Sequence, residues 1–113
     1  MTSIHLVCRP NGALKSCRAE GHSGYGKKGT DIVCAAISVL VRTALQTISK
    51  LKGVCVECSL PERGIVDFCV KQTEFSEKID AELEFAGKFL EEGFSSLAEE
   101  YPENVILYKQ TEA

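Results

Sequence analysis

The sequence predicts a small mixed α/β fold of the α+β type, in which about five strands form one sheet and two helices pack on it. Short runs rich in Val, Ile, Leu and Cys, bounded by turn residues, have the composition of strands. Two longer runs without proline carry apolar residues at helical spacing. These runs follow one another in the order β-β-α-β-β-α-β. The 113 residues, of which 44% are hydrophobic and 26% charged, suffice for one core, so we expect residues 1–113 to form a single domain.

The first two strands are expected at residues 3–9 and 13–20, on either side of Pro10-Asn11-Gly12. An Asn-Gly pair between two strand-like runs is a strong signal for a β-hairpin. The second strand then delivers the chain to His22 at the edge of the sheet. His5 alternates with apolar neighbours, so we expect it to face solvent or a sheet edge and to take no part in catalysis.

A glycine-rich loop follows this hairpin. Because glycine tolerates unusual backbone dihedral angles, we predict that the loop is mobile and covers a cleft, with its freedom supplied by Gly21, Gly24, Gly26 and Gly29. Residues 24–29 match the G-x-G-x-x-G pattern, but a dinucleotide site needs a parallel strand-helix-strand unit, and the preceding hairpin is antiparallel. The loop amides, with Lys27 and Lys28, leave an alternative open, namely a non-catalytic module that binds phosphate or a nucleotide.

The run from Cys34 to Ile48 predicts a helix, since it contains no Gly or Pro and has apolar residues on almost every face. We therefore expect this helix to be buried on most sides, with Thr30 as its N-cap. Cys34 then lies in or just after the first turn, where unpaired N–H groups and the helix dipole favour a thiolate. His22 stands at the start of a loop that can fold back, so its imidazole is placed to take the thiol proton and later return it to a leaving group.

Cys34 and His22 are thus the candidate nucleophile and general base. The alternative is that Cys34 is a buried structural cysteine and His22 an ordinary loop residue. Asp31 and Ser38 lie three residues before and four residues after Cys34, on its helical stripe, where either can orient His22 or hold substrate. Equally open are a plain first-turn acid at Asp31 and, at Ser38, a helix hydroxyl bonded to its own backbone.

The second half of the chain predicts a hairpin, a helix and a last strand. The hairpin strands are expected at residues 54–60 and 65–71, on either side of a proline- and glycine-containing turn. Ser76 is a good N-cap for a helix that has one apolar stripe and an acidic outer face. Pro102 ends this helix, and a strand follows at residues 104–109.

Cys55 and Cys58 form a C-x-x-C motif in the first strand of that hairpin. Residues three apart on a strand point to opposite faces, so the two thiols cannot readily bind one metal or close a disulfide. No second pair at finger spacing completes a four-ligand site. The sequence therefore predicts no metal, and nothing in it indicates another cofactor.

Charge and hydropathy limit the possible partners and the cellular compartment of the protein. A net charge of −3 and a pI near 5.4 argue against direct binding of nucleic acid or an anionic membrane. No apolar run approaches the roughly 20 residues that span a bilayer, and the start of the chain lacks a signal-peptide pattern. We therefore expect a cytoplasmic protein whose six cysteines are free thiols. The two helices leave one sheet face uncovered, and we expect a homodimer to form through that face.

Gly21-His22, a glycine-bearing loop and then Gly29-x-Asp31-Ile32-Val33-Cys34-Ala35-Ala36-x-Ser38 resemble the signature of the bacterial ribosomal-processing cysteine protease family, Prp. The resemblance covers essentially the whole chain. It implies a small mixed α/β fold, a homodimer, and an endopeptidase that removes a short N-terminal extension from the twenty-seventh protein of the large ribosomal subunit. It also implies that Cys34 is the nucleophile and His22 the base. The competing hypothesis is then a non-catalytic, ribosome-associated module whose 24–29 loop binds an anion.

Overall fold

The computed structural model describes residues 1–27, 30–59 and 65–113 of the chain. Its elements follow the predicted order β-β-α-β-β-α-β, which confirms the fold class. The strands and helices are β1 (Thr2–Cys8), β2 (Leu14–Glu20), α1 (Ile32–Ser49), β3 (Val54–Ser59), β4 (Ile65–Gln72), α2 (Glu77–Glu100) and β5 (Val105–Thr111).

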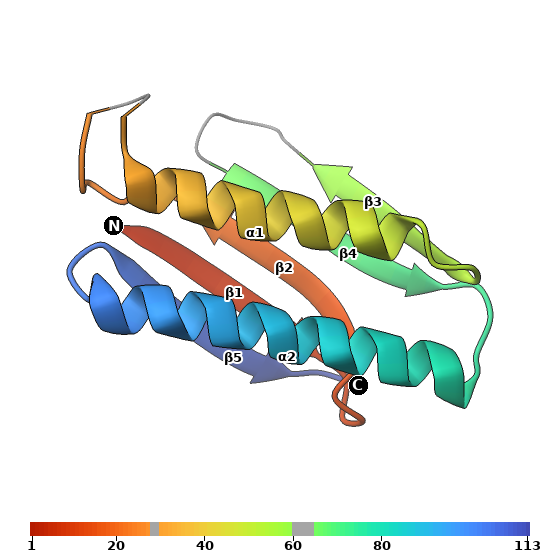
Figure 1. Cartoon of the computed structure of the whole chain (residues 1–113). Helices are drawn as coiled ribbons and strands as arrows, with labels where there is room; N and C mark the ends of the chain where they lie inside the picture. The colour runs from red at the N-terminus through yellow and green to blue at the C-terminus, as the bar shows by residue number, and fades with distance from the viewer. Residues whose placement is uncertain (28–29, 60–64) are drawn as a thin grey trace.

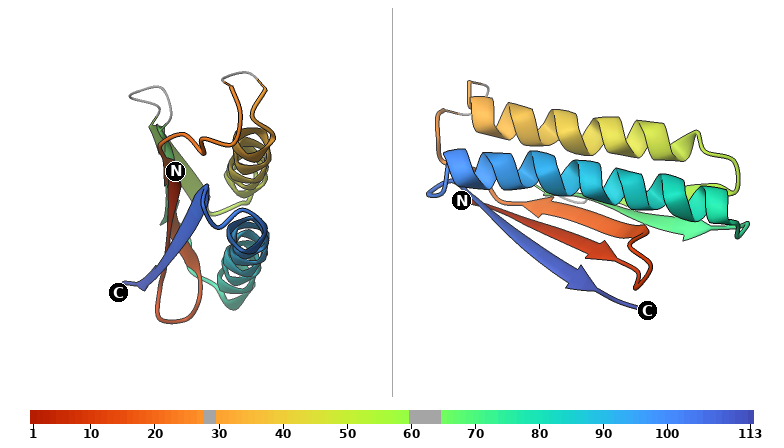
Figure 2. Two further views of the ribbon diagram at one scale, coloured as in Figure 1. Left: turned by 90° about the vertical axis from the view of Figure 1, so that its left-hand side faces the viewer. Right: turned by 60° about the horizontal axis from the view of Figure 1, so that its bottom comes forward.

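The five strands form one mixed sheet in the order β3-β4-β2-β1-β5. Neighbouring strands are antiparallel except for β1 and β5, which run parallel with Thr2 opposite Val105. The long α2 makes this parallel pair possible because it carries the chain back along the sheet before β5 begins. Both helices lie on the same face of the sheet, which gives the molecule two layers (Figures 1 and 2).

The core lies between the sheet and the helices. Alternate strand residues point into it, as expected for a sheet with one covered face. Its largest fully buried side chains are Phe68 on β4 and Phe94 on α2. Around these two pack buried aliphatic residues of β1, β2, α1 and α2, among them Ile4, Leu6, Leu14, Val33, Val41, Leu83 and Leu90.

The prediction that α1 is buried on most sides is wrong. Its buried residues are confined to one stripe, formed by Val33, Ile37, Val41 and Ile48. Val39, for example, is 63% exposed. In a two-layer fold only the side of the helix that faces the sheet is covered, so the apolar residues on its other sides remain at the surface.

By length and composition alone, α1 is also apolar enough to cross a membrane, which the sequence did not lead us to expect. Helices in the core of globular proteins pass the same test, and α1 packs on the sheet here.

The uncovered face of the sheet carries polar and charged side chains. His5 stacks on Tyr108 with ring centroids 4.9 Å apart, and Arg18 forms ion pairs with Glu20 and Asp67. Ion pairs on a surface are unlike the apolar core of a typical homodimer interface. The expectation that a second copy docks on this face stays a prediction.

The C-x-x-C cysteines lie on opposite faces of β3, as predicted. Cys55 pairs with the exposed Lys71 of β4, whereas Cys58 pairs with the buried Phe68. All six cysteines of the chain are free thiols. Across the residues that the structure describes, no group of three or more His, Cys, Asp or Glu side chains is arranged to hold a metal ion.

Candidate active site

Helix α1 begins at Ile32 and is capped by Asp31, so the prediction of Thr30 as N-cap is wrong. Both residue types are good caps, but the hydroxyl of Thr30 donates to the carbonyl of Lys27 at 2.8 Å and closes a turn in the loop. Asp31 has an extended backbone, and its Oδ1 accepts the amides of Val33 at 2.9 Å and Cys34 at 3.0 Å. Thr30 therefore shapes the loop, and Asp31 starts the helix.

The second carboxylate oxygen of Asp31 holds the glycine loop. Oδ2 accepts the hydroxyl of Ser23, the amide of Gly26 at 3.1 Å and the amide of Tyr25 at 3.2 Å. Burial alone would raise the pKa of Asp31, but hydrogen bonds from Ser23 and from the helix and loop amides outweigh it and hold that pKa well below its ordinary value. Asp31 is thus a charged anchor that joins the loop to the first turn of α1.

Cys34 lies in the first turn of α1 with its sulfur turned toward Ser23. The amide of Ser23 donates to Sγ at 3.5 Å, and the hydroxyl oxygen of Ser23 lies 3.5 Å from the same sulfur. Ser23 is 1% exposed, whereas Cys34 is half-buried. The sulfur therefore combines partial access from solvent with an N–H donor and a helix N-terminus, the two features that stabilise a thiolate.

A hollow of about 390 Å³ brings the predicted site residues together. It is lined by His22, Gly24, Gly26, Asp31, Cys34, Ala35 and Ser38. Both members of the predicted pair therefore face one concave space, and Ser38 lies one helical turn beyond the sulfur. Gly29, also predicted for the loop, lies outside the described residues.

Gly21 stands where the loop leaves β2, outside the lining of the hollow. Its φ is +93°, and a Cβ at this position would lie 2.5 Å from the backbone oxygen of Met1. Only glycine fits here, because a side chain would be strained and would also collide with main chain. Gly21 therefore sets the path by which His22 enters the site.

His22 is exposed and lines the hollow. The described hydrogen bonds of the Cys34 sulfur run to Ser23, and none within the described residues runs to His22. Catalytic hydrogen bonds are often long in enzymes without substrate and tighten when substrate binds. The chain has two histidines, and the other, His5, stacks on Tyr108 on the uncovered sheet face. His22 is thus the one imidazole at the Cys34 hollow.

Sequence reasoning missed Ser23 and Asn104. The side-chain amide of Asn104, in the turn between α2 and β5, donates to the carbonyl of Ser23 at 2.8 Å. Ser23 follows His22 directly and carries a hydroxyl, so its position in the sequence could have identified it as a site residue. Asn104 is 81 residues from Ser23 in sequence, and only the return of the chain through α2 brings the two together.

Two donors of the anion-binding alternative are already engaged within the described part of the loop. The loop amides of Tyr25 and Gly26, which would grip a phosphate, donate instead to the carboxylate of Asp31. An external anion would have to displace the Asp31 carboxylate from these two amides. Lys28 and Gly29, which the alternative also uses, lie outside the described residues.

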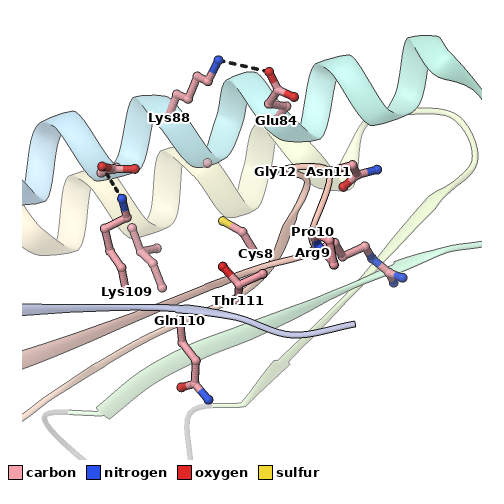
Figure 3. Close-up of a pocket in the computed structure, with 13 residues that line it drawn as sticks. Cys8, Arg9, Pro10, Asn11, Gly12, Glu84, Lys88, Lys109, Gln110 and Thr111 are labelled. Atoms are coloured by element: carbon pink, nitrogen blue, oxygen red, sulfur yellow. Dashed lines mark hydrogen bonds and ion pairs between the residues drawn. The ribbon is translucent and has the colours of Figure 1, made fainter.

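A second hollow, of about 530 Å³, lies at the other end of β1 and contains Cys8 (Figure 3). Two ion pairs border it, Lys109 with Glu91 at 2.6 Å and Lys88 with Glu84 at 3.0 Å. Burial and the Glu91 carboxylate raise the pKa of the Cys8 thiol, although Lys109 opposes them. Its lining contains no histidine, and the raised pKa of Cys8 disfavours the thiolate, so this hollow lacks the cysteine–histidine pair of the Cys34 hollow.

Comparisons with known proteins bear on this site. A family model described as "Cysteine protease Prp" matches residues 1–106. A search of curated protein sequences gave no match.

Three solved structures share the fold. The ribosomal processing protease Prp of Staphylococcus aureus, in complex with a covalently linked product peptide, is 20% identical with a TM-score of 0.80 and covers 96% of this chain and 99% of its own. SMU.848 of Streptococcus mutans is 27% identical with a TM-score of 0.76, over 99% of this chain and 96% of its own. The Staphylococcus aureus Prp in complex with a substrate peptide is 19% identical with a TM-score of 0.73, over 96% of this chain and 99% of its own.

Proposed function

The chain belongs to the cysteine protease Prp family, and from that membership we propose that it removes the short N-terminal extension of a large-subunit ribosomal protein, the twenty-seventh, during ribosome maturation. The observation that carries the proposal is the hollow in which Cys34, at a helix N-terminus, and His22 face the same space. A cysteine protease needs a thiolate and an imidazole beside a cleft, and Cys34 and His22 line one hollow among the described residues.

The proposed reaction uses Cys34 as nucleophile and His22 as base. His22 takes the proton from Sγ, and the thiolate attacks the carbonyl carbon of the scissile peptide bond. The C–N bond then breaks as His22 returns the proton to the leaving amine, which leaves a thioester on Cys34. Water, deprotonated by His22, attacks the thioester and releases a carboxylate product with the free thiol.

Ser23 and the helix terminus support this chemistry at the sulfur. As negative charge gathers on Sγ, the amide of Ser23 and the N-terminal end of α1 stabilise it. The Cys34 amide, an obvious donor for the tetrahedral oxyanion, is bonded to Asp31 at 3.0 Å. We propose that Asp31 acts by holding the loop and that Ser38, which lines the hollow, contacts the substrate.

The substrate is a peptide in this proposal because two similar structures hold a substrate or product peptide. Gly24 and Gly26 of the glycine loop line the hollow, and Gly24 has a φ of +74° with open space where a Cβ would stand. Such a residue supplies the freedom that a lid needs to admit an extended chain. A chain of net charge −3 suits a basic ribosomal protein, and we propose the cytoplasm, where ribosomes mature, as its place of action.

We also propose a homodimer that forms through the outer side of the helical layer. Phe85 is 70% and Phe89 is 55% exposed on α2, and both line an apolar hollow of about 540 Å³ between the two helices.

Sedimentation velocity tests the homodimer with a matched pair of variants. Phe85→Glu, on the outer side of α2, is expected to give monomers because it buries a charge in the interface. Tyr108→Glu, on the uncovered sheet face, is expected to leave the dimer intact. A monomeric wild type at high micromolar concentration would contradict the proposal, and cosedimentation of that monomer with lipid vesicles would assign the exposed apolar surface to a membrane.

The substrate is tested with the ribosomal protein from the same organism. The purified chain is incubated with that protein, and the products are identified by intact mass spectrometry. Loss of a fixed N-terminal segment, absent when the extension is replaced by a scrambled sequence, is the expected result. An intact ribosomal protein, under conditions where a general thiol-protease peptide is cleaved, would contradict the proposed substrate but not the protease activity.

A further inference from the structure

We propose that Asn104 is a positioning residue for the nucleophile, because its side chain holds the carbonyl of Ser23, the residue whose amide faces the Cys34 sulfur. The inference rests on the proposed function for its kinetic consequence. Its structural basis is a contact between the turn that follows α2 and the loop that follows β2, two segments 81 residues apart.

Ser23 uses each of its polar groups to hold one orientation. Its amide donates to Cys34 Sγ at 3.5 Å, its hydroxyl donates to Asp31, and its carbonyl accepts from Asn104 at 2.8 Å. The residue is 1% exposed, so water is not at hand to replace a lost partner. The direction in which the Ser23 amide points therefore depends on the hydrogen bonds of the Ser23 side chain and carbonyl.

Asn104 is itself fixed by the backbone around it. The backbone amide of Asn104 donates to the carbonyl of Tyr101 at 2.9 Å, and its backbone carbonyl accepts the amide of Thr2 at 2.9 Å. The next residue, Val105, is 2% exposed and pairs with Thr2 where β5 meets β1. The side chain of Asn104 thus extends from a rigid part of the fold toward a glycine-rich loop that is otherwise held mainly by Asp31.

The contact matters most when the thiol ionises. A hydrogen bond to a charged acceptor is roughly twice as strong as one to a neutral acceptor, so the Ser23 amide contributes most to the thiolate. If Ser23 rotates, the sulfur loses this donor. The Ser23 amide belongs to the peptide bond with His22, so a rotation of Ser23 also shifts the backbone next to the proposed base.

The residue type at 104 is chemically specific. An amide nitrogen can donate to the Ser23 carbonyl, whereas a carboxylate of the same shape would face that carbonyl with a second acceptor. Asn104→Asp should therefore repel the Ser23 peptide, and Asn104→Ala should only release it. The larger effect of the more conservative change distinguishes positioning from simple packing.

The test compares Asn104→Asp and Asn104→Ala with Glu103→Ala, an exposed neighbour in the same turn. The first readout is the rate at which iodoacetamide alkylates Cys34 at pH 7, measured by peptide mapping with Cys55 and Cys69 as internal references. The second is kcat and KM for the ribosomal peptide. We expect Asn104→Asp to lower both the alkylation rate and kcat by about tenfold or more with KM within about twofold, Asn104→Ala to have a smaller effect, and Glu103→Ala to match wild type.

Rates for both Asn104 variants within about twofold of the Glu103→Ala control would overturn the proposal. So would loss of the native circular dichroism spectrum in both, because Asn104 would then be needed for folding and not for positioning. Alkylation requires no peptide substrate, so it decides the role of Asn104 even where wild type leaves the ribosomal peptide intact. Failure of the inference and failure of the proposed function are therefore distinguishable.

Discussion

Two cysteines of this chain each open onto a hollow, at opposite ends of the sheet, and their surroundings differ in nearly every respect. Cys34 lies in the first turn of α1 with the Ser23 amide on its sulfur and a histidine in the lining of its hollow. Cys8 ends a strand, and burial together with the Glu91 carboxylate raises its pKa. The hollow at Cys8 is the larger, about 530 Å³ against about 390 Å³. The size of a cavity therefore says less about reactivity than the backbone and charges that face the thiol.

The two regions also use their carboxylates in opposite ways. Asp31 accepts hydrogen bonds from amides at the start of a helix, where the dipole favours a negative charge. Glu91 pairs with Lys109 and acts on Cys8 as a like charge that opposes ionisation. The Asp31 carboxylate therefore holds a site together, whereas the Glu91 carboxylate opposes ionisation of the thiol in its hollow.

Alkylation gives the largest expected contrast. At pH 7 iodoacetamide should modify Cys34 at least about tenfold faster than Cys8, because the thiolate is the reactive form and only Cys34 has donors arranged for it. Peptide mapping at short reaction times measures both rates in one sample. Equal rates for Cys34 and Cys8 would remove the distinction between the two hollows.

Asp31→Asn sharpens the comparison through stability. The substitution should cost about 2 kcal/mol of unfolding free energy at pH 7, near the upper end for an N-cap, because it removes a charged acceptor with several donors. The folded-state pKa of Asp31 lies below its unfolded value, so its contribution is complete above about pH 4 and is lost as pH falls toward the folded pKa.

Urea denaturation of wild type and Asp31→Asn at pH 7 and pH 3 checks this prediction. The difference in unfolding free energy between the two proteins should be large at pH 7 and smaller at pH 3. Glu91→Gln, which removes the carboxylate at the other hollow, is the matched control and should show little difference at pH 7. If the loss of unfolding free energy in Asp31→Asn stays constant with pH, the charge of the Asp31 carboxylate plays no part in stability.

Glu91→Gln gives the smallest expected effect and acts on the other thiol. Removing the carboxylate lowers the pKa of Cys8 and leaves Lys109 as the nearby charge, so alkylation of Cys8 should speed up by roughly threefold. The rate at Cys34 should not change. An unaltered Cys8 rate would show that burial alone suppresses this thiol.

Much of the Cys34 region follows from local sequence. Strand and helix periodicities predicted the order of elements, and the positions of Cys34 and His22 on either side of a glycine loop predicted a shared site. Thr30 was mistaken for the N-cap because the two adjacent residues compete for the same role, and only the turn that Thr30 closes with Lys27 decides between them.

Other features depend on contacts that a local pattern does not contain. Asn104 reaches Ser23 only after α2 has carried the chain back along the sheet. The exposure of Val39 depends on the number of layers in the fold, because in a two-layer protein the chain covers only the side of a helix that faces the sheet. Apart from the N-cap of α1, sequence reasoning was therefore reliable within an element or a loop, and it failed where distant elements meet.

Cleavage of a peptide that spans the ribosomal N-terminal extension tests the central claim most directly. Wild type, Cys34→Ala, His22→Ala and Cys8→Ala are incubated with the peptide, and the products are identified by mass spectrometry. We predict cleavage at one bond by wild type and by Cys8→Ala, and its loss by a factor of about a thousand or more in Cys34→Ala and His22→Ala. Cleavage that survives in a folded Cys34→Ala variant, or that disappears in Cys8→Ala, would contradict the assignment of the active site to the Cys34 hollow.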